Sequence, residues 1–329
     1  MAASNLALFW AGVIALAILV YVVLDGFDLG VGILFGFNRD AAQRTQMIDS
    51  IAPFWDGNET WLVVIGASLY AAFPVVYAVF LGAFYLPVLL LLFGLIFRGV
   101  AFEFRLHSTR ARGFWDGGFC VGSAVAAFVQ GAAVGAMMRG IRVADGQFAG
   151  GAFDWLAPFP MLTGLGLVLG YALLGAGWLV LKNDGALRQW ALRRVRWLSA
   201  ALVLTLALAF LGTLDLSVPA RGNLGLRPWG LVFPLLGVAA LLAVPGSASR
   251  HDALPFALTV GFFVCAYLTL GVMYWPYMVP YRITVAGAAA PEASLSFLFW
   301  GAGLFVLPVI AVYTAAVYWI FRGKTRKGC

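Results

Sequence analysis

The chain has 329 residues, of which 63% are hydrophobic and 11% are charged, and its formal net charge is +7. A soluble domain carries about 45–50% apolar and about 25% charged residues, so this composition excludes a soluble globular protein and predicts a polytopic membrane protein. The positive charge does not indicate nucleic-acid binding, because the placement of the basic residues between apolar segments explains it better.

The three cysteines, Cys120, Cys265 and Cys329, lack metal-like spacing and predict neither a disulfide framework nor a zinc site. No residue follows Cys329, so the tail does not match a prenylation signal. The first apolar run has no basic residue before it and no small-residue cleavage site, and we expect a retained helix there, not a signal peptide.

A bilayer span needs about 20 mostly apolar residues, and by this rule the sequence predicts nine spans in a single polytopic domain, 1–329. The polar stretch 38–49 predicts a short surface helix. A fused apolar stretch must break near 72–77, where Pro74 can begin a helix but not continue one. The spans are 6–37, two within 51–104, 119–138, 159–181, 198–214, 229–244, 254–275 and 295–321.

The nine-span topology divides the basic loop residues unequally. Sixteen of the 21 lysines and arginines fall on the side of the C-terminus, and an eight-span topology would place the basic C-terminus on the wrong side. Because lysine and arginine concentrate in cytoplasmic loops, we expect the N-terminus outside and the C-terminus in the cytoplasm. The opposite side holds only Arg139, Arg142, Arg221, Arg227 and Arg282.

Aromatic residues gather at the ends of two predicted spans, at 274–277 and at Tyr318 and Trp319. Such clusters are typical of the belts that anchor helices at the membrane interface. A cofactor role is the weaker interpretation.

The stretch 50–61 places polar residues beside an apolar run. Ionisable groups at the edge of the bilayer are costly, and by default they face a partner, water or a proton route. The alternative is that the two acids are ordinary helix-start residues in a cytoplasmic loop. The residues of interest in this stretch are Trp55, Asp56, Asn58, Glu59 and Trp61.

Asp25 and Asp28 are spaced so that both carboxylates lie on one face of a helix. Glycines at 26, 30 and 32 allow a second helix to approach closely. Because the residues from 29 to 37 are apolar again, we expect a buried, paired or proton-handling role. The alternative is that the two acids mark the cytoplasmic end of a long helix.

Arg98 lies late in the third span and is followed by Glu103 and Arg105. An unpaired charge there would be unfavourable, so we expect Arg98 to be the counter-charge of one of the acids on the first two spans. Together these residues predict a polar cluster near the cytoplasmic face. Carboxylates spaced along a channel can pass protons, and a static ion-pair lattice that joins helices is the competing interpretation.

The two histidines, His107 and His251, fall in predicted cytoplasmic loops. Haem iron needs axial ligands such as histidine or methionine, and a methionine in an apolar helix usually serves packing. We therefore expect no His-based haem site in this chain. If the protein belongs to a redox enzyme, the metal centres lie in another subunit.

Three segments and the C-terminal tail together resemble subunit II of cytochrome bd-type quinol oxidases, including the cyanide-insensitive branch. The matching segments are DGFDLGVG at 25–32, SIAPFWDGNETW at 50–61, FRGVAFEFR at 97–105, and parts of the tail from 276 to 324. The similarity extends over nearly the whole chain. It implies an all-α fold of two four-helix groups plus one peripheral helix.

The resemblance implies a subunit of the bacterial inner membrane, with its N-terminus in the periplasm, that binds no haem itself. Its partner would be subunit I, which carries two b-type haems and one d-type haem and oxidises quinol at the outer face. The complex would reduce oxygen to water with cytoplasmic protons. Small single-span accessory subunits and a structural quinone occur in the family, and the sequence does not decide either.

The family's embedded acids are associated with proton delivery, and the resemblance carries this role to Asp28 and Asp56, and then to Asp25 and Glu103. Glu103 stands where some relatives have aspartate. Trp61 belongs to the matched segment and would line an oxygen or proton passage. Two other functions stay open: an ion-coupled secondary transporter that uses the same aspartates, and a purely scaffolding oxidase subunit.

Overall fold

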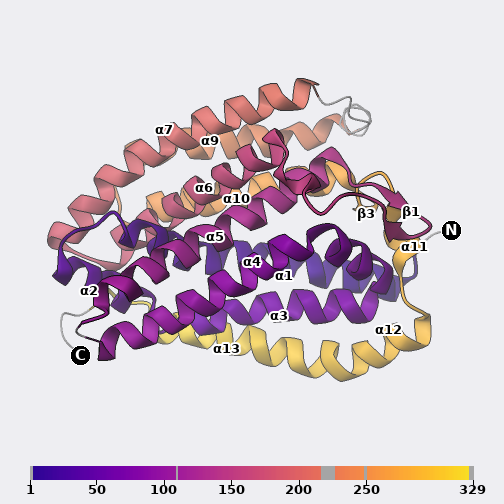
Figure 1. Ribbon diagram of the computed structural model, residues 1–329, viewed down its shortest axis with the longest axis horizontal. Helices are drawn as coiled ribbons and strands as arrows, with labels where there is room; N and C mark the ends of the chain where they lie inside the picture. Colours follow the sequence, from indigo (N-terminus) through magenta and orange to yellow (C-terminus); the bar gives the residue numbers. More distant parts are fainter. Residues whose placement is uncertain (1–2, 109, 216–226, 248–249, 326–329) are drawn as a thin grey trace.

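The computed structural model describes residues 3–108, 110–215, 227–247 and 250–325, and most of these residues are helical. The long helices run side by side as one bundle (Figure 1), which agrees with the all-α prediction. Two short antiparallel hairpins lie at the end of the bundle where α1 begins. Four residues used in the sequence argument, Arg221, Arg326, Lys327 and Cys329, lie outside the described residues.

The helices follow one another along the chain, and the connection from α5 to α6 contains a hairpin. In chain order they are α1 (Asn5–Phe35), α2 (Ala41–Ile51), α3 (Trp55–Ala72), α4 (Pro74–His107), α5 (Arg112–Arg139), α6 (Pro158–Lys182), α7 (Gly185–Asp215), α9 (Val232–Ser247), α10 (Leu254–Tyr274), α11 (Val285–Ala288), α12 (Glu292–Leu298) and α13 (Leu307–Ile320). A π-helical stretch, Phe299–Val306, joins α12 to α13. The hairpins are β1 (Val143–Ala144) with β2 (Gln147–Phe148), and β3 (Tyr277–Val279) with β4 (Ile283–Thr284).

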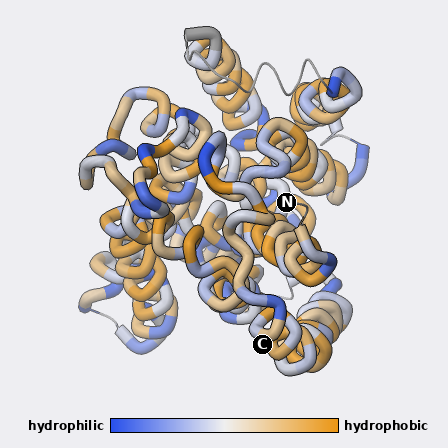
Figure 2. Tube along the Cα trace, turned by 90° about the vertical axis from the view of Figure 1, so that its right-hand side faces the viewer, coloured by the Kyte–Doolittle hydropathy of each residue, from blue (hydrophilic) through white to orange (hydrophobic). Residues whose placement is uncertain are grey.

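Eight helices of the described chain are long and apolar enough to cross a membrane. Large hydrophobic side chains cover their outward faces: Phe93 is 65% exposed, Leu235 70% and Phe297 82%. Figure 2, which looks along the bundle, shows hydrophobic colouring on outward and inward sides alike. Helices that are apolar all round are suited to a lipid environment.

The remaining predicted span corresponds to α3, which is absent from these eight because its first turns carry Asp56, Asn58 and Glu59. The predicted break is confirmed, since α3 ends at Ala72 and α4 begins at Pro74. The polar stretch after α1 forms the predicted surface helix as α2.

The sixth span begins earlier than the predicted residue 198. Helix α7 starts at Gly185, so its first turns contain the arginines from 188 to 196 that the sequence analysis assigned to a loop. Helices that project beyond the hydrocarbon core continue in polar sequence, and hydropathy alone does not locate their ends.

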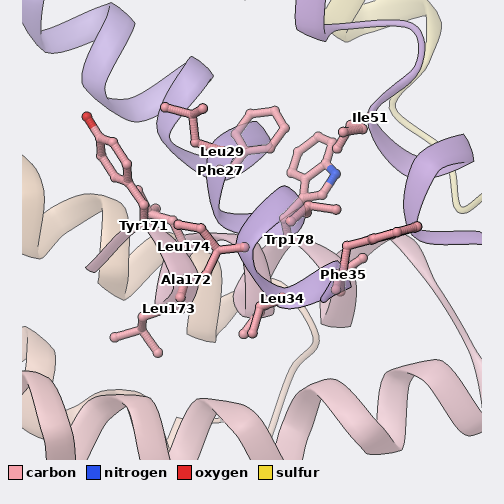
Figure 3. Packing of buried hydrophobic residues seen from close by; sticks show 14 of the residues in the cluster. Phe27, Leu29, Leu34, Phe35, Ile51, Tyr171, Ala172, Leu173, Leu174 and Trp178 are labelled. Carbon is pink, nitrogen blue, oxygen red and sulfur yellow. The ribbon is translucent and has the colours of Figure 1, made fainter. Parts of the chain in front are cut away.

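Helix α1 packs against α3, α5 and α6. The contact with α6 depends on two glycines, because a Cβ atom on Gly30 would lie 1.8 Å from the Tyr171 carbonyl oxygen, and one on Gly175 would lie 2.4 Å from the Gly30 carbonyl carbon. The two backbones therefore touch at this crossing. Figure 3 shows the surrounding core, in which the rings of Phe27 and Trp178 stack with centroids 4.1 Å apart.

The C-terminal segment fixes the end of α13 against α6. The Lys182 ammonium donates to the carbonyl oxygens of Phe321 and Gly323, and the Thr325 N–H donates to the Lys182 carbonyl. Lys324 adds ion pairs to Asp184 and Asp252. These contacts set the position of the last turn of α13, which carries Tyr318.

We predict that Gly30→Ala lowers the thermal midpoint of the assembled protein, because the new methyl group has no space between α1 and α6. Overpacking of this kind costs about 1–3 kcal/mol. Thermal unfolding of the purified complex, followed by intrinsic fluorescence, measures the change.

Gly12→Ala is the matched control, because Gly12 lies on the same helix and a Cβ there meets nothing within 4 Å. The control should unfold at the wild-type temperature or slightly above it, since alanine is the better helix former. Equal midpoints for Gly30→Ala and the wild type would contradict the close crossing.

Candidate functional site: a buried carboxylate cluster

Arg98 is the centre of a charged cluster inside the helical bundle. It lies on α4 and is 1% exposed. Its Nη1 atom lies 3.0 Å from Oδ1 of Asp25 on α1 and 2.8 Å from Oε1 of Glu59 on α3. The predicted role of Arg98 as counter-charge is confirmed, and one guanidinium connects three helices.

Asp28 lies one turn further along α1 and is fully buried. The Asn58 side-chain amide donates to Asp28 Oδ2 at 2.7 Å and to the Leu24 carbonyl at 3.3 Å. The Tyr318 hydroxyl of α13 donates to Asn58 Oδ1 at 3.1 Å. Asn58 thus connects an embedded carboxylate to the last helix of the chain.

Several polar atoms of this cluster are buried and have no hydrogen-bond partner among the described residues. They include Asp28 Oδ1 and the Nε and Nη2 atoms of Arg98. Buried polar atoms are almost always hydrogen-bonded, so each exception calls for an explanation. Asp28 Oδ1 can accept a hydrogen bond or a proton, and the two Arg98 N–H groups can donate hydrogen bonds to water.

The outer boundary of the cluster lies on α3. The Glu59 side chain is 24% exposed, and Asp56, one turn earlier on the same helix, is exposed. The Trp55 ring lies 6.0 Å from Arg98 Cζ and contacts the ring of Phe102. The cluster therefore extends from two fully buried aspartates to a carboxylate at the surface of this chain.

Glu103 does not join the cluster. It lies on an exposed face of α4. Arg105, which the sequence analysis grouped with it, pairs instead with Asp116 of α5 at 2.5 Å, and Asp116 also pairs with Arg44 at 2.8 Å. This second ion-pair group connects α2, α4 and α5 and has no acid from α1 or α3.

Three polar residues that the sequence analysis missed extend the cluster into the core. The Tyr171 hydroxyl donates to Gln130 Oε1 at 3.0 Å, and Gln130 Nε2 donates to the Tyr21 hydroxyl at 3.2 Å. Tyr21 precedes Asp25 by four residues and shares its helix face. The available signal was Gln130 itself, a polar residue in the small-residue run of α5.

Tyr318 was also missed, because the sequence analysis assigned it with Trp319 to an interfacial belt. Trp319 is 67% exposed and fits that interpretation, whereas Tyr318 turns inward to Asn58. Trp61 of α3 is 8% exposed, and it belongs to a small hydrophobic cluster with Tyr21 of α1.

Within the part of the chain that the structure describes, no group of three or more His, Cys, Asp or Glu side chains could hold a metal ion. His107 is the last residue of α4 and not a loop residue, and His251 lies between α9 and α10. Cys120 and Cys265 are free thiols on different helices.

The solved bd oxidase from Geobacillus thermodenitrificans contains a chain with the same fold. The TM-score is 0.78, and the alignment covers 97% of this chain and 99% of that one. The sequence identity is 14%, so this likeness shows the fold alone.

Sequence comparison identifies the family. The chain is 31% identical to cytochrome bd-I ubiquinol oxidase subunit 2 of Escherichia coli K12, over 97% of this chain and 94% of the relative. It is 29% identical to cytochrome bd ubiquinol oxidase subunit 2 of Bacillus subtilis, over 96% and 95%. The model of the family described as cytochrome bd terminal oxidase subunit II matches residues 6–321. The chain therefore belongs to the cytochrome bd terminal oxidase subunit II family and is a subunit of a quinol oxidase complex.

Proposed function

We propose that this chain supplies a proton route from the cytoplasm to the oxygen-reducing centre of its oxidase, and that Asp25, Asp28, Glu59 and Arg98 form the buried part of that route. The two b-type haems and one d-type haem belong to subunit I in this proposal, as does quinol oxidation at the outer face. The buried carboxylate cluster is the observation that carries the proposal.

The charges of the cluster support proton handling. Three carboxylates, those of Asp25, Asp28 and Glu59, surround one guanidinium, that of Arg98. Full ionisation would leave uncompensated negative charge inside the bilayer, which is costly. A proton shared among the carboxylates removes this cost, and a shared proton can move between them.

The exposure of the carboxylates decreases from α3 to α1, which supports proton movement from the α3 surface inward. Asp56 and Glu59 are accessible at the α3 surface, whereas Asp25 and Asp28 are fully buried. A proton that enters at the α3 face would pass Glu59 and reach Asp25 beside Arg98. Glu103, on an exposed face of α4, would serve only as an outer collector.

The proposal includes nine membrane crossings, with α3 as the ninth. Helix α1 begins at one end of the bundle and α13 ends at the other (Figure 1), which supports an odd number of crossings. At one end of α3, Asn58 contacts Tyr318; at the other, the Ala72 carbonyl accepts from the Ala290 N–H, just before α12. With 18 residues α3 is about 27 Å long, close to the hydrocarbon thickness. The division into two four-helix groups plus one peripheral helix is carried over from the resemblance to the family.

The charge distribution supports a periplasmic N-terminus and a cytoplasmic C-terminus in the bacterial inner membrane. Of the minority arginines, Arg139 ends α5 beside the β1–β2 hairpin, and Arg227 donates to carbonyl oxygens at the end of α10. Both positions lie at the end of the bundle where α1 begins. Of the described majority, Arg44 lies on α2, Lys182 ends α6 and Lys324 follows α13, all at the opposite end.

Family membership does not favour an independent ion-coupled transporter. A purely scaffolding role differs from proton delivery in one measurable respect: loss of a structural carboxylate lowers assembly, whereas loss of a proton carrier lowers the turnover of complexes that have assembled. The following prediction separates the two.

We predict that Asp28→Asn, and likewise Asp25→Asn, lowers quinol-driven oxygen consumption per haem, because the amide cannot carry a proton. Proton-transfer groups contribute about 10²–10⁴-fold to the steps they serve, so a loss of about tenfold or more is expected. Oxygen-electrode rates, normalised to the d-type haem absorbance of the purified complex, measure it.

Asp145→Asn is the matched control, because Asp145 is exposed in the β1–β2 hairpin. Its positive φ of 50° also suits asparagine. The control should keep the wild-type rate. Wild-type turnover per haem in both variants, with lowered haem content, would replace the proton role with a scaffolding role.

We predict that two introduced cysteines are labelled from opposite sides of the membrane. Each is introduced singly into a variant in which the three native cysteines are replaced by serine. Gln147→Cys, in the β1–β2 hairpin, should react with an impermeant maleimide on intact spheroplasts. Ala42→Cys, on α2, should react only after permeabilisation.

The pair of sites also tests whether α3 crosses the membrane. If α3 did not cross, residues 42 and 147 would lie on the same side and label together. Labelling with the two sides exchanged would instead contradict the orientation. Oxygen consumption by each variant verifies that the complex is intact.

A further inference from the structure

A cavity of about 550 Å³ lies at the end of the bundle where α1 begins, away from the carboxylate cluster. It is enclosed by α4, the end of α5, the β1–β2 hairpin and the short helix Asp154–Leu156. Its volume is within the range of small-molecule sites, about 300–1,000 Å³. Nothing in the proton route uses it.

A break in α4 opens the cavity. Phe84 departs from helical geometry, with φ −123° and ψ 25°, and Pro87 follows three residues later. Proline has no N–H, so the Ala83 carbonyl loses the donor that residue 87 would otherwise supply. Ala83 and Phe84 line the cavity. A Cβ atom on the preceding residue, Gly82, would lie 3.1 Å from the Phe148 side chain of β2, so the hairpin packs closely against α4.

The charged side chains that line the cavity are Arg139, Arg142 and Asp154, so the net charge of the lining is positive. Arg142 Nη2 lies 3.0 Å from Asp154 Oδ2. The Gly151 N–H and Arg142 both donate to Asp154 and hold the pKa of that carboxyl below its usual range, so Asp154 is ionised at neutral pH and balances Arg142. Arg139, on the last turn of α5, also lowers the pKa of Asp154 through its charge, but it forms no ion pair at contact distance with any described residue, so two arginines face one aspartate.

The rest of the lining is mostly apolar and reaches the protein surface beside the end of α5. Phe153 is 66% exposed and Leu156 39%, whereas Trp155 is buried and donates its Nε1–H to the Ala152 carbonyl. Aromatic residues at helix ends are typical of the lipid headgroup level. An occupant that satisfies both parts of the lining has an anionic head and an apolar tail.

We propose that this cavity binds an anionic phospholipid, with its phosphate beside the Arg139 guanidinium and an acyl chain along the exposed side chains of Phe153 and Leu156. Basic pockets between membrane helices bind such headgroups. Arginine presents a planar set of donors that matches a phosphate. The net positive charge of the cavity favours an anionic lipid over a zwitterionic one.

The test titrates the purified oxidase complex with phosphatidylglycerol and counts the bound lipid by native mass spectrometry. Arg139→Gln should weaken the tightest site about tenfold, because a hydrogen bond to a charged group is lost. Phosphatidylcholine should bind wild type and variant equally weakly. Inorganic phosphate at the same concentration should not displace the lipid, because it lacks the acyl chains.

Arg282→Gln is the matched control, because Arg282 is an exposed arginine at the same end of the bundle that does not line the cavity. It should leave the tight site unchanged. Equal lipid affinity of Arg139→Gln and wild type would overturn the proposal. Displacement by inorganic phosphate, or extraction of a quinone in place of the lipid from this site, would also overturn it.

Discussion

The ion pair between Arg98 and Asp25 joins two of the helices that carry the site. Arg98 comes from α4, Asp25 from α1 and Glu59 from α3, so the position of each helix depends on the other two. Removing one partner of a buried pair costs about 3–5 kcal/mol, because the other charge is left uncompensated in an apolar surrounding. Replacing the whole set with apolar residues would avoid this cost, so stability alone does not explain why charges lie here.

Close helix contacts make this arrangement possible. The crossing of α1 and α6 at Gly30 and Gly175 brings α1 into the middle of the bundle, where Asp25 and Asp28 are 0% exposed. On the other side of the site, the Lys182 contacts fix the last turn of α13 and so the Tyr318 hydroxyl that contacts Asn58. The environment of Asp28 therefore depends on residues at both ends of the sequence.

The parts of the site that follow local rules could be predicted from the sequence, and those that depend on tertiary contacts could not. The break at Pro74 follows from proline chemistry, and the pairing of Arg98 follows from the cost of a buried charge. Tyr318 lies 260 residues from Asn58, and Gln130 lies 109 from Tyr21. A tyrosine near a helix end has the sequence signature of an interfacial anchor whether it points to lipid or inward.

Tertiary contacts also explain why Asp56 and Glu59, which their spacing predicts to share one environment, differ in exposure in the structure. Three-residue spacing puts two side chains on neighbouring parts of a helix face, but it does not say where a neighbouring helix ends. Arg98 of α4 reaches Glu59, whereas no described residue pairs with Asp56. The carboxylates thus form a series that begins at the α3 surface and ends beside α1.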